Sequence, residues 1–271
     1  IVLTTIVAAC ALVSPYVSKL IVDRVIQHEQ YGMLKNLIIV LIVTIIIRGI
    51  CRFFSQVLFE TSSQNVLYSM RDTVYRKLLQ EDFAFYNKNR TGDLMSRQTG
   101  DMDAIRHFVA YVIYVTYEYV LYFVIALIMI FATNLKMALC MVLVLPLTAL
   151  TTYFQAKSVK PAFRNCRNAF SSLNTFVQEN VSGNRVVKAF AKEDYEMDKF
   201  AVENDKYRDS ELGAANVWKK YVPLFELFSN ILTLVLMLVG GIMVVNGQMT
   251  MGDLVAVNGY LWMLTMPLRM A

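Results

Sequence analysis

The chain has 271 residues, of which 56% are hydrophobic and 17% charged, with a net charge of +5 and a mean hydropathy of +0.46. Soluble domains are about half apolar and about a quarter charged, so this composition excludes an ordinary soluble domain. Residues 70–106 and 157–220 hold 7 and 12 of the 26 Lys and Arg, and both segments are also rich in acids. This mixture favours solvated helical surfaces, and we expect no nucleic-acid partner.

Long runs with almost no charge interrupt the sequence. They are Leu3–Ser18, Asn36–Ile47, Phe108–Thr133, Met137–Gln155 and Leu227–Met251. Apolar runs of about 18 residues or more are typical of membrane-spanning helices. Because a bilayer core offers no water to backbone amides, open sheets are excluded there. The sequence therefore predicts an all-α membrane protein.

Six long helices are expected in chain order, as one membrane domain over residues 1–271. Their approximate ranges are 1–27, 31–79, 92–133, 135–187, 194–245 and 253–271. A helix of about 50 residues is ~75 Å long, whereas a bilayer with its headgroups is about 40–45 Å thick. The second and fourth helices should therefore project beyond the membrane, although Pro146 and Pro161 are expected to kink or break the fourth.

Charge distribution sets the expected orientation. Because Lys and Arg gather on the cytoplasmic side, residues 70–106 and 157–220 are predicted to be cytoplasmic, as are both ends. The turn at Thr133–Asn134 is then external. After a cytoplasmic turn at Phe83–Arg90, Thr91 is the expected N-cap of the third helix. A plasma-membrane, multi-pass protein is predicted.

The four cysteines, Cys10, Cys51, Cys140 and Cys166, form no CxxC or Cys/His cluster, and the chain has only 2 His. They are interpreted as reduced packing residues without a metal site or a disulfide. Ile1 begins inside an apolar run without an initiator Met. The chain is therefore expected to be a fragment of a larger protein.

Two charged stretches carry the strongest motifs. Residues 85–97 read FYNKNRTGDLMSR, and residues 178–194 read QENVSGNRVVKAFAKED. They resemble the patterns that type I ABC exporters share after their second and fourth spans. Motif order, loop lengths and spans agree over essentially the whole chain. The chain therefore resembles the transmembrane domain of a type I ABC exporter, of the kind that exports drugs or lipids.

The resemblance implies a bundle of six long helices that pairs with a second half, as a homodimer or a heterodimer. It also implies two short coupling helices, near Phe83–Lys88 and Arg185–Glu193, that touch nucleotide-binding domains. The residues implied in coupling are Phe83, Phe85, Tyr86, Asn87, Lys88, Arg185, Lys188, Phe190 and Glu193. From the residues alone, the aromatic side chains of the first turn either dock a partner or pack against their own hairpin.

The chain lacks the motifs of a nucleotide site. No phosphate loop G-x-x-x-x-G-K-[ST] and no Ser-Gly-Gly-Gln signature occurs in the sequence, so this chain alone is not expected to bind or hydrolyse ATP. Enzymatic activity stays uncertain at this point. The resemblance places ATP and Mg on a nucleotide-binding domain outside this sequence, within an ATP-hydrolysing parent protein.

Four charged side chains fall within the predicted spans: Arg48, Arg52, Glu118 and Glu226. Such groups are costly in a membrane and usually face the bundle interior or a wet cavity. Helix depth allows the pairs Arg48–Glu118 and Arg52–Glu226. The functional hypothesis is that Glu118 or Glu226 receives cationic substrates, and the alternative is a structural ion pair.

A stripe of tyrosines surrounds one of these acids. Tyr111, Tyr114, Glu118 and Tyr122 share one helix face, which could line a cavity for aromatic amphiphiles or simply pack in the bundle. Methionines such as Met263 and Met266 suit adaptable apolar contacts, and equally suit ordinary packing.

The sequence predicts the transmembrane half of an ATP-driven exporter that moves amphiphilic drugs or lipids out of the cell by alternating access. Its expected partners are nucleotide-binding domains, a second half, the lipid bilayer and amphiphilic small molecules. The alternatives are an ion-gradient-driven carrier, which would favour mid-membrane acid or His relays, and a non-transporting membrane scaffold. Peptide export also stays open.

Overall fold

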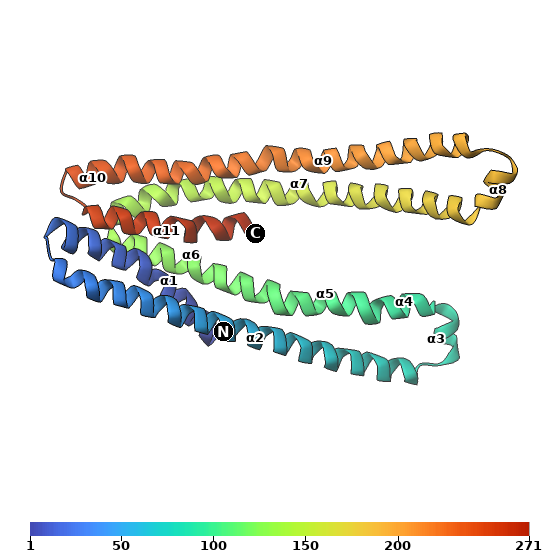
Figure 1. Cartoon of the computed structure of the whole chain (residues 1–271), viewed down its shortest axis with the longest axis horizontal. Helices are drawn as coiled ribbons and strands as arrows, with labels where there is room; N and C mark the ends of the chain where they lie inside the picture. The colour runs from blue at the N-terminus through green and yellow to red at the C-terminus, as the bar shows by residue number, and fades with distance from the viewer. Residues whose placement is uncertain (271) are drawn as a thin grey trace. The chain divides into compact units, whose positions relative to one another are not determined.

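The computed structural model describes residues 1–270, which fold into helices joined by short turns (Figure 1). Within those residues there is no strand, so the all-α fold predicted from the sequence is confirmed. The chain divides into two compact units, described one at a time below. The first holds Ile1–Leu139 and Leu236–Pro267, and the second holds Cys140–Val235 with the chain from Leu268 onward.

The first unit contains most of the elements. They are α1 (Val2–Leu20), η1 (Ile21–Gln27), η2 (Tyr31–Met33), α2 (Leu34–Gln80), α3 (Phe83–Lys88), α4 (Thr91–Ser96), η3 (Arg97–Asp101), α5 (Met102–His107), η4 (Phe108–Val112), α6 (Ile113–Thr133), the start of α7 (Leu135–Ser182), η5 (Leu236–Gly240), α10 (Gly241–Val245) and α11 (Met251–Met270). η1, η3, η4 and η5 are π-helical turns, and η2 is a single 3₁₀ turn.

α2 is the longest element of this unit. Its 47 residues correspond to a rod of about 70 Å, more than twice the roughly 30 Å hydrocarbon thickness of a bilayer. α1 packs along the first part of α2, where Val17, Val25 and Leu37 form a buried apolar cluster. Farther along, α2 packs against α5 and η4. One end of α2 is therefore held by an apolar helix, and the other by a return helix.

The return rod runs without interruption from α4 to α6, with π turns at η3 and η4. Polar contacts join it to α2: Gln98 Nε2 donates to the Arg71 carbonyl at 3.0 Å. Arg106 lies 3.0 Å from Glu60. Exposed ion pairs each contribute little, so these contacts keep the two rods in register more than they add stability.

α3 closes this hairpin, and its first turn is capped. Asp82 has an extended backbone, and its carboxylate accepts a hydrogen bond from the Phe85 amide at 2.9 Å. That bond satisfies one of the amides that a helix start leaves unpaired. At the other end, Asn89 Nδ2 donates to the Phe85 carbonyl at 2.9 Å. Local polar contacts therefore define both ends of α3.

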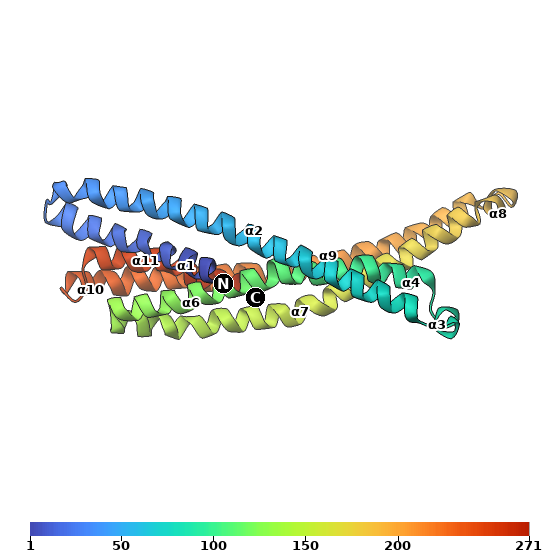
Figure 2. The same ribbon diagram turned by 90° about the horizontal axis from the view of Figure 1, so that it is seen from below.

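The second unit is a long antiparallel hairpin of α7 and α9 (Glu193–Val235), with α8 (Asn184–Ala189) at its tip (Figures 1 and 2). Contacts are spread along its length. The Cys166 thiol donates to the Ser210 carbonyl at 3.1 Å, and the hydroxyls of Ser158 and Tyr221 lie 3.0 Å apart. Both helices are therefore held together well beyond the apolar part of α7.

Five helical stretches are long and apolar enough to cross a membrane. They are Val2–Gln27, Tyr31–Gln80, Thr91–Thr133, Leu135–Ser182 and Glu193–Val245. α11, with 20 residues, is not among them. Spanning by the predicted sixth helix therefore stays a prediction, and its last predicted residue, 271, lies outside the described residues.

Three local expectations need correction. Arg90, not Thr91, is the N-cap residue of α4: it has the extended backbone, and Thr91 is already helical. The fourth long helix ends at Ser182, short of the predicted Val187, because the chain turns at Gly183 and starts α8. The break expected at Pro146 and Pro161 does not occur, because α7 continues through both prolines, which membrane helices tolerate; the alternative expectation, a kink, stays a prediction.

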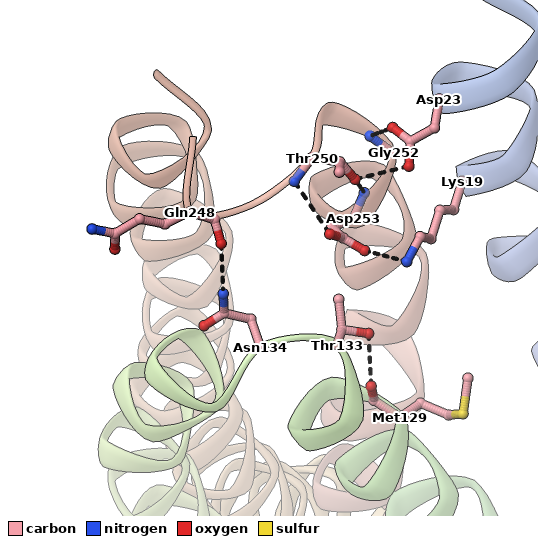
Figure 3. Close-up of polar contacts among 9 residues, drawn as sticks. All are labelled: Lys19, Asp23, Met129, Thr133, Asn134, Gln248, Thr250, Gly252 and Asp253. Carbon is pink, nitrogen blue, oxygen red and sulfur yellow. Dashed lines mark hydrogen bonds and ion pairs between the residues drawn. The ribbon is translucent and has the colours of Figure 1, made fainter. Parts of the chain in front are cut away.

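The end of the first unit opposite α3, here called the short-turn end, is held by a polar network (Figure 3). The Asp23 carboxylate accepts hydrogen bonds from the Thr250 hydroxyl at 2.8 Å and the Gly252 amide at 2.7 Å. Lys19 pairs with Asp253 at 2.5 Å. Thr250 and Asp253 also cap each other's amides, at 3.0 and 3.2 Å. The start of α11 is thereby fastened to the end of α1, through Lys19, and to η1, through Asp23.

We predict that Gly252→Ala destabilises the protein by about 2 kcal/mol, because a Cβ at Gly252 would lie 2.5 Å from the Asp23 carboxylate. Asp23 would then have to move and lose at least the hydrogen bond from the residue 252 amide, and such a bond contributes about 1.5–3 kcal/mol when one partner is charged. Thermal unfolding of the purified full-length protein measures the effect. Gly241→Ala is the matched control, since a Cβ added at Gly241 would have no other atom within 4 Å. Equal midpoints for the two variants would contradict this account.

A second prediction concerns α3. Asp82→Ala removes the N-cap acceptor, which typically costs about 1 kcal/mol, and the short helix has little else to hold its first turn. Amide hydrogen exchange should quicken several-fold at the Phe85 amide while α2 keeps its protection. Asp82→Asn, which retains an acceptor, should behave like the wild type. Unchanged exchange in Asp82→Ala would show that the cap is unimportant.

Candidate functional sites

The tip of the first hairpin carries three aromatic side chains, of which Phe83 is the most exposed. Phe83 is 90% exposed. By contrast, the Tyr86 hydroxyl donates to the Leu78 carbonyl of α2 at 2.6 Å, and its ring meets that of Phe85 edge-on at 5.5 Å. Tyr86 is thus tied to α2 although 41% of its surface is exposed, and docking of a partner by these aromatic residues stays a prediction.

Two polar residues complete α3. Asn87 and Lys88 are both exposed, and Lys88 lies in the last turn, where a positive charge interacts favourably with the helix dipole. The short helix covers the range expected for a first coupling helix. It begins with an exposed aromatic ring, Phe83, and ends with an exposed cation, Lys88.

The tip of the second hairpin is built by two backbone turns. Gly183 follows α7 in a tight turn, where an added Cβ would lie 3.1 Å from the Glu179 carbonyl oxygen. Ala191, with a φ of 46°, reverses the chain after α8. Between them, Phe190 is 72% exposed. This tip therefore also presents an aromatic side chain, on a turn that the backbone tightly defines.

The charged residues predicted for this tip lie around α8. Arg185 and Lys188 are exposed on α8, and Glu193 starts α9. Beside them lies a groove of about 410 Å³ with a mainly apolar lining, which includes Phe176, Val177, Val181, Met197 and Phe200. The second tip thus combines basic side chains with an adjoining apolar groove.

A row of hydrogen-bonded polar side chains joins α2 to α6 within the membrane-spanning part of the first unit. The Tyr122 hydroxyl donates to Glu118 Oε1 at 2.7 Å, and Arg48 Nη2 donates to the same hydroxyl at 3.5 Å. No ion pair joins Arg48 directly to Glu118 within residues 1–270. The proposed pair is therefore corrected: the phenol of Tyr122 lies between the two charges.

The tyrosine stripe is only partly aligned. Tyr114, Glu118 and Tyr122 are buried, with 5%, 4% and 3% of their surface exposed, whereas Tyr111 is 49% exposed and stacks on His107 at 5.4 Å. The π turn η4 ends at Val112, so the wider turn shifts the helical phase between Tyr111 and Tyr114. Placing Tyr111 on this face was therefore wrong.

The second predicted pair joins residues of different units. Arg52 on α2 belongs to the first unit and Glu226 on α9 to the second, and both are exposed. The ion pairs found among residues 1–270 include neither residue. The pair stays a prediction, as does a cationic substrate at Glu226.

Sequence reasoning missed the network at the short-turn end (Figure 3). One signal was available, because Thr250-x-x-Asp253 has the spacing of a capping box. Nothing local links Asp23 to Thr250, which lie 227 positions apart. Asn134 Nδ2 also donates to the Gln248 carbonyl at 3.2 Å, which ties the turn before α7 to the turn before α11.

Comparison with known proteins agrees with this architecture. The family "ABC transporter transmembrane region" matches residues 1–268. An uncharacterized ABC transporter ATP-binding protein of Bacillus subtilis is 33% identical over 94% of this chain and 44% of its own length. The multidrug resistance-like ATP-binding protein MdlA of Escherichia coli is 28% identical over 98% of the chain and 45% of its own. An ATP-dependent lipid A-core flippase of Syntrophus aciditrophicus is 26% identical over 95% and 42%.

The chain spans less than half the length of each of these relatives. The match covers every helix from α1 to the greater part of α11, including both hairpins and their tips. The chain is therefore a member of the ABC transporter transmembrane region family, with the architecture of an exporter transmembrane domain.

Proposed function

We propose that this chain is the membrane half of an ATP-driven exporter that moves amphiphilic drugs or lipids out of the cell by alternating access. The observation that carries the proposal is the pair of hairpins that outreach a bilayer and end in the short helices α3 and α8. Family membership supports an ATP-driven exporter over an ion-gradient carrier. Relatives named for multidrug resistance and lipid A-core flipping support amphiphilic substrates.

α3 and α8 are proposed to dock onto nucleotide-binding domains. Their exposed aromatic residues, Phe83 and Phe190, have the character of interface anchors, and both stand on turns that are held by caps or tight backbone geometry. A docked domain that moves α3 or α8 would pull a rod of about 70 Å. The polar contacts that brace α2 against α5 support movement as one body.

Nucleotide chemistry is assigned to the docked domains. This sequence contains no phosphate loop, so its residues do not fit ATP or Mg, and no step of hydrolysis is attributed to them. The chain's own part is to bind substrate and to change shape. A second half, either identical or different, would complete the pore.

The proposed orientation follows from charge. The segments around α3 and α8 carry most of the Lys and Arg of the chain, which favours the cytoplasm for both tips. The short-turn end then faces the outside, and a plasma-membrane location is proposed. The proposed substrate site of the first unit is formed by Arg48, Arg52, Glu118, Tyr114 and Tyr122, through direct contact or by holding a neighbour in place, and Glu226 is the candidate in the second unit.

The prediction for coupling uses the two tips. In the full-length protein reconstituted in proteoliposomes, Phe83→Ala and Phe190→Ala should each lower ATP-dependent transport of a fluorescent amphiphile at least about tenfold, because an interface anchor contributes about 2 kcal/mol or more. ATP binding and thermal stability should stay at wild-type levels, since both side chains are exposed.

Leu212→Ala is the matched control, because Leu212 is an exposed apolar residue on the shaft of α9. It should transport normally. Wild-type transport by both the Phe83→Ala and the Phe190→Ala variant would contradict docking through these residues. Transport by the wild-type protein that does not depend on ATP would overturn the exporter proposal itself.

A further inference from the structure

Three charged side chains lie together within the membrane-spanning part of the first unit. Arg48 and Arg52 stand one turn apart on α2, and Glu118 lies on α6. The Glu118 carboxylate is buried and accepts its hydrogen bond from Tyr122 at 2.7 Å. With two guanidinium groups and one carboxylate, the cluster has an excess of positive charge.

Two contacts between α2 and α6, one on either side of Arg52, show which residues of α6 lie opposite Arg52. α2 and α6 run in opposite directions, and Arg48 meets Tyr122 at one level while the rings of Phe59 and Tyr114 meet at 5.1 Å at another. Four residues along α2 from Arg48 lead to Arg52, and four residues back along α6 from Tyr122 lead to Glu118. Arg52 therefore lies level with Glu118, on the α2 face that carries Arg48.

One buried polar atom near this level has no partner. The Tyr114 hydroxyl, one turn from Glu118 on the same face of α6, makes no hydrogen bond within the described residues, although Tyr114 is 5% exposed. An unpaired buried hydroxyl is unfavourable. An unpaired phenol and an exposed guanidinium thus stand near each other in a region where polar groups normally find partners.

Aromatic rings surround these polar groups. Phe59 packs on Tyr114, and Trp262 of α11 meets Tyr122 edge-on at 5.4 Å. Rings of this kind offer adaptable contacts to an apolar body. The site therefore pairs a positive polar end with apolar walls, as an amphiphile requires.

We propose that Arg52 and the Tyr114 hydroxyl bind the negatively charged headgroup of an amphiphile. The proposal rests on the exporter function proposed above and names its substrate class. A guanidinium group binds phosphate, sulfonate or carboxylate through two parallel hydrogen bonds, and the phenol donates a third. Glu118, already bonded to Tyr122, holds the phenol of Tyr122 and the guanidinium of Arg48 in place. A cation at Glu118 would meet the excess positive charge, so the hypothesis of a cationic substrate is replaced at this site.

The test uses the full-length protein in nanodiscs of neutral phosphatidylcholine. Its probes are two pairs with identical fluorescent chains: phosphatidylglycerol against phosphatidylcholine, and an alkyl sulfonate against an alkyl trimethylammonium. We expect the anionic member to bind at least about tenfold more tightly, equivalent to about 1.4 kcal/mol. A preference within the lipid pair alone identifies a lipid headgroup, and one within the alkyl pair alone identifies a soluble amphiphile.

Substitutions then locate the preference. Arg52→Gln should reduce it to less than about twofold, and Arg52→Lys should keep most of it because the charge remains. Tyr114→Phe keeps the ring against Phe59 and should lower the affinity for the anionic probe about threefold to tenfold. Tyr119→Phe is the matched control: Tyr119 lies off the buried stripe, and its variant should bind like the wild type.

Three results would overturn the proposal: equal affinities in the wild type, a preference for the cationic probe, or an anion preference that survives in Arg52→Gln. A fourth would be rescue of folding by the double exchange Arg52→Glu with Glu226→Arg when each single exchange fails, since Glu226 would then be the counter-charge. If the protein prefers anionic probes but shows no ATP-driven transport, only the exporter proposal is contradicted. If it transports but shows no preference for anionic probes, only the proposed headgroup site is contradicted.

Discussion

The constraint on which this structure depends is that a bilayer core cannot solvate a peptide bond. Each backbone amide within it must be paired inside its own element, so the apolar runs become helices whatever their neighbours do. α2, α7 and α9 then continue for tens of ångströms beyond the length that a bilayer needs. Outside the apolar region the hydrophobic drive is weaker, and the hairpins are held instead by ion pairs, amide contacts and scattered aromatic pairs. Along each long helix, the change from apolar to polar packing marks where the membrane-spanning part ends and the projecting part begins.

To act as levers, as proposed, the hairpins must be stiff along their length and well defined at their tips. α2 is one uninterrupted α-helix, whereas its partner rod contains two π turns, η3 and η4. Contacts from Arg71 and Glu60 reach the return rod beside these turns, where a helix is most easily deformed. At the tips, Asp82 caps α3, and Gly183 and Ala191 define the path around α8. The exposed phenylalanines are thus carried on short, locally determined structures.

Helix positions were predictable because they follow from apolar runs, turn residues and motif spacing, each of which is local. Sequence reasoning failed on two points: the helix face on which a side chain lies, and the partner that a polar side chain contacts. Tyr111 left the predicted stripe because a π turn precedes Tyr114, whereas placing these residues on one helix face assumes 3.6 residues per turn throughout. Arg48 and Glu118 were placed at similar depths, but depth alone could not show that the phenol of Tyr122 would stand between them. The contacts of Asp23 with Thr250 and Gly252 join the two ends of the chain, and no local pattern encodes such a distance.

The polar cluster of α2 and α6 is difficult to explain as a stabilising device. A charged side chain at the centre of a membrane helix costs about 2.5–3.5 kcal/mol even by the mildest scale, and two arginines stand here against one carboxylate. A purely structural network would pair each charge and leave no buried hydroxyl without a partner, whereas the Tyr114 hydroxyl has none within the described residues. If the chain works in the proposed exporter, which must hold a substrate briefly and release it, this incomplete pairing has a functional explanation. In the proposed mechanism the missing acceptor arrives with the substrate, and the free energy of completing the cluster then favours the substrate-bound shape.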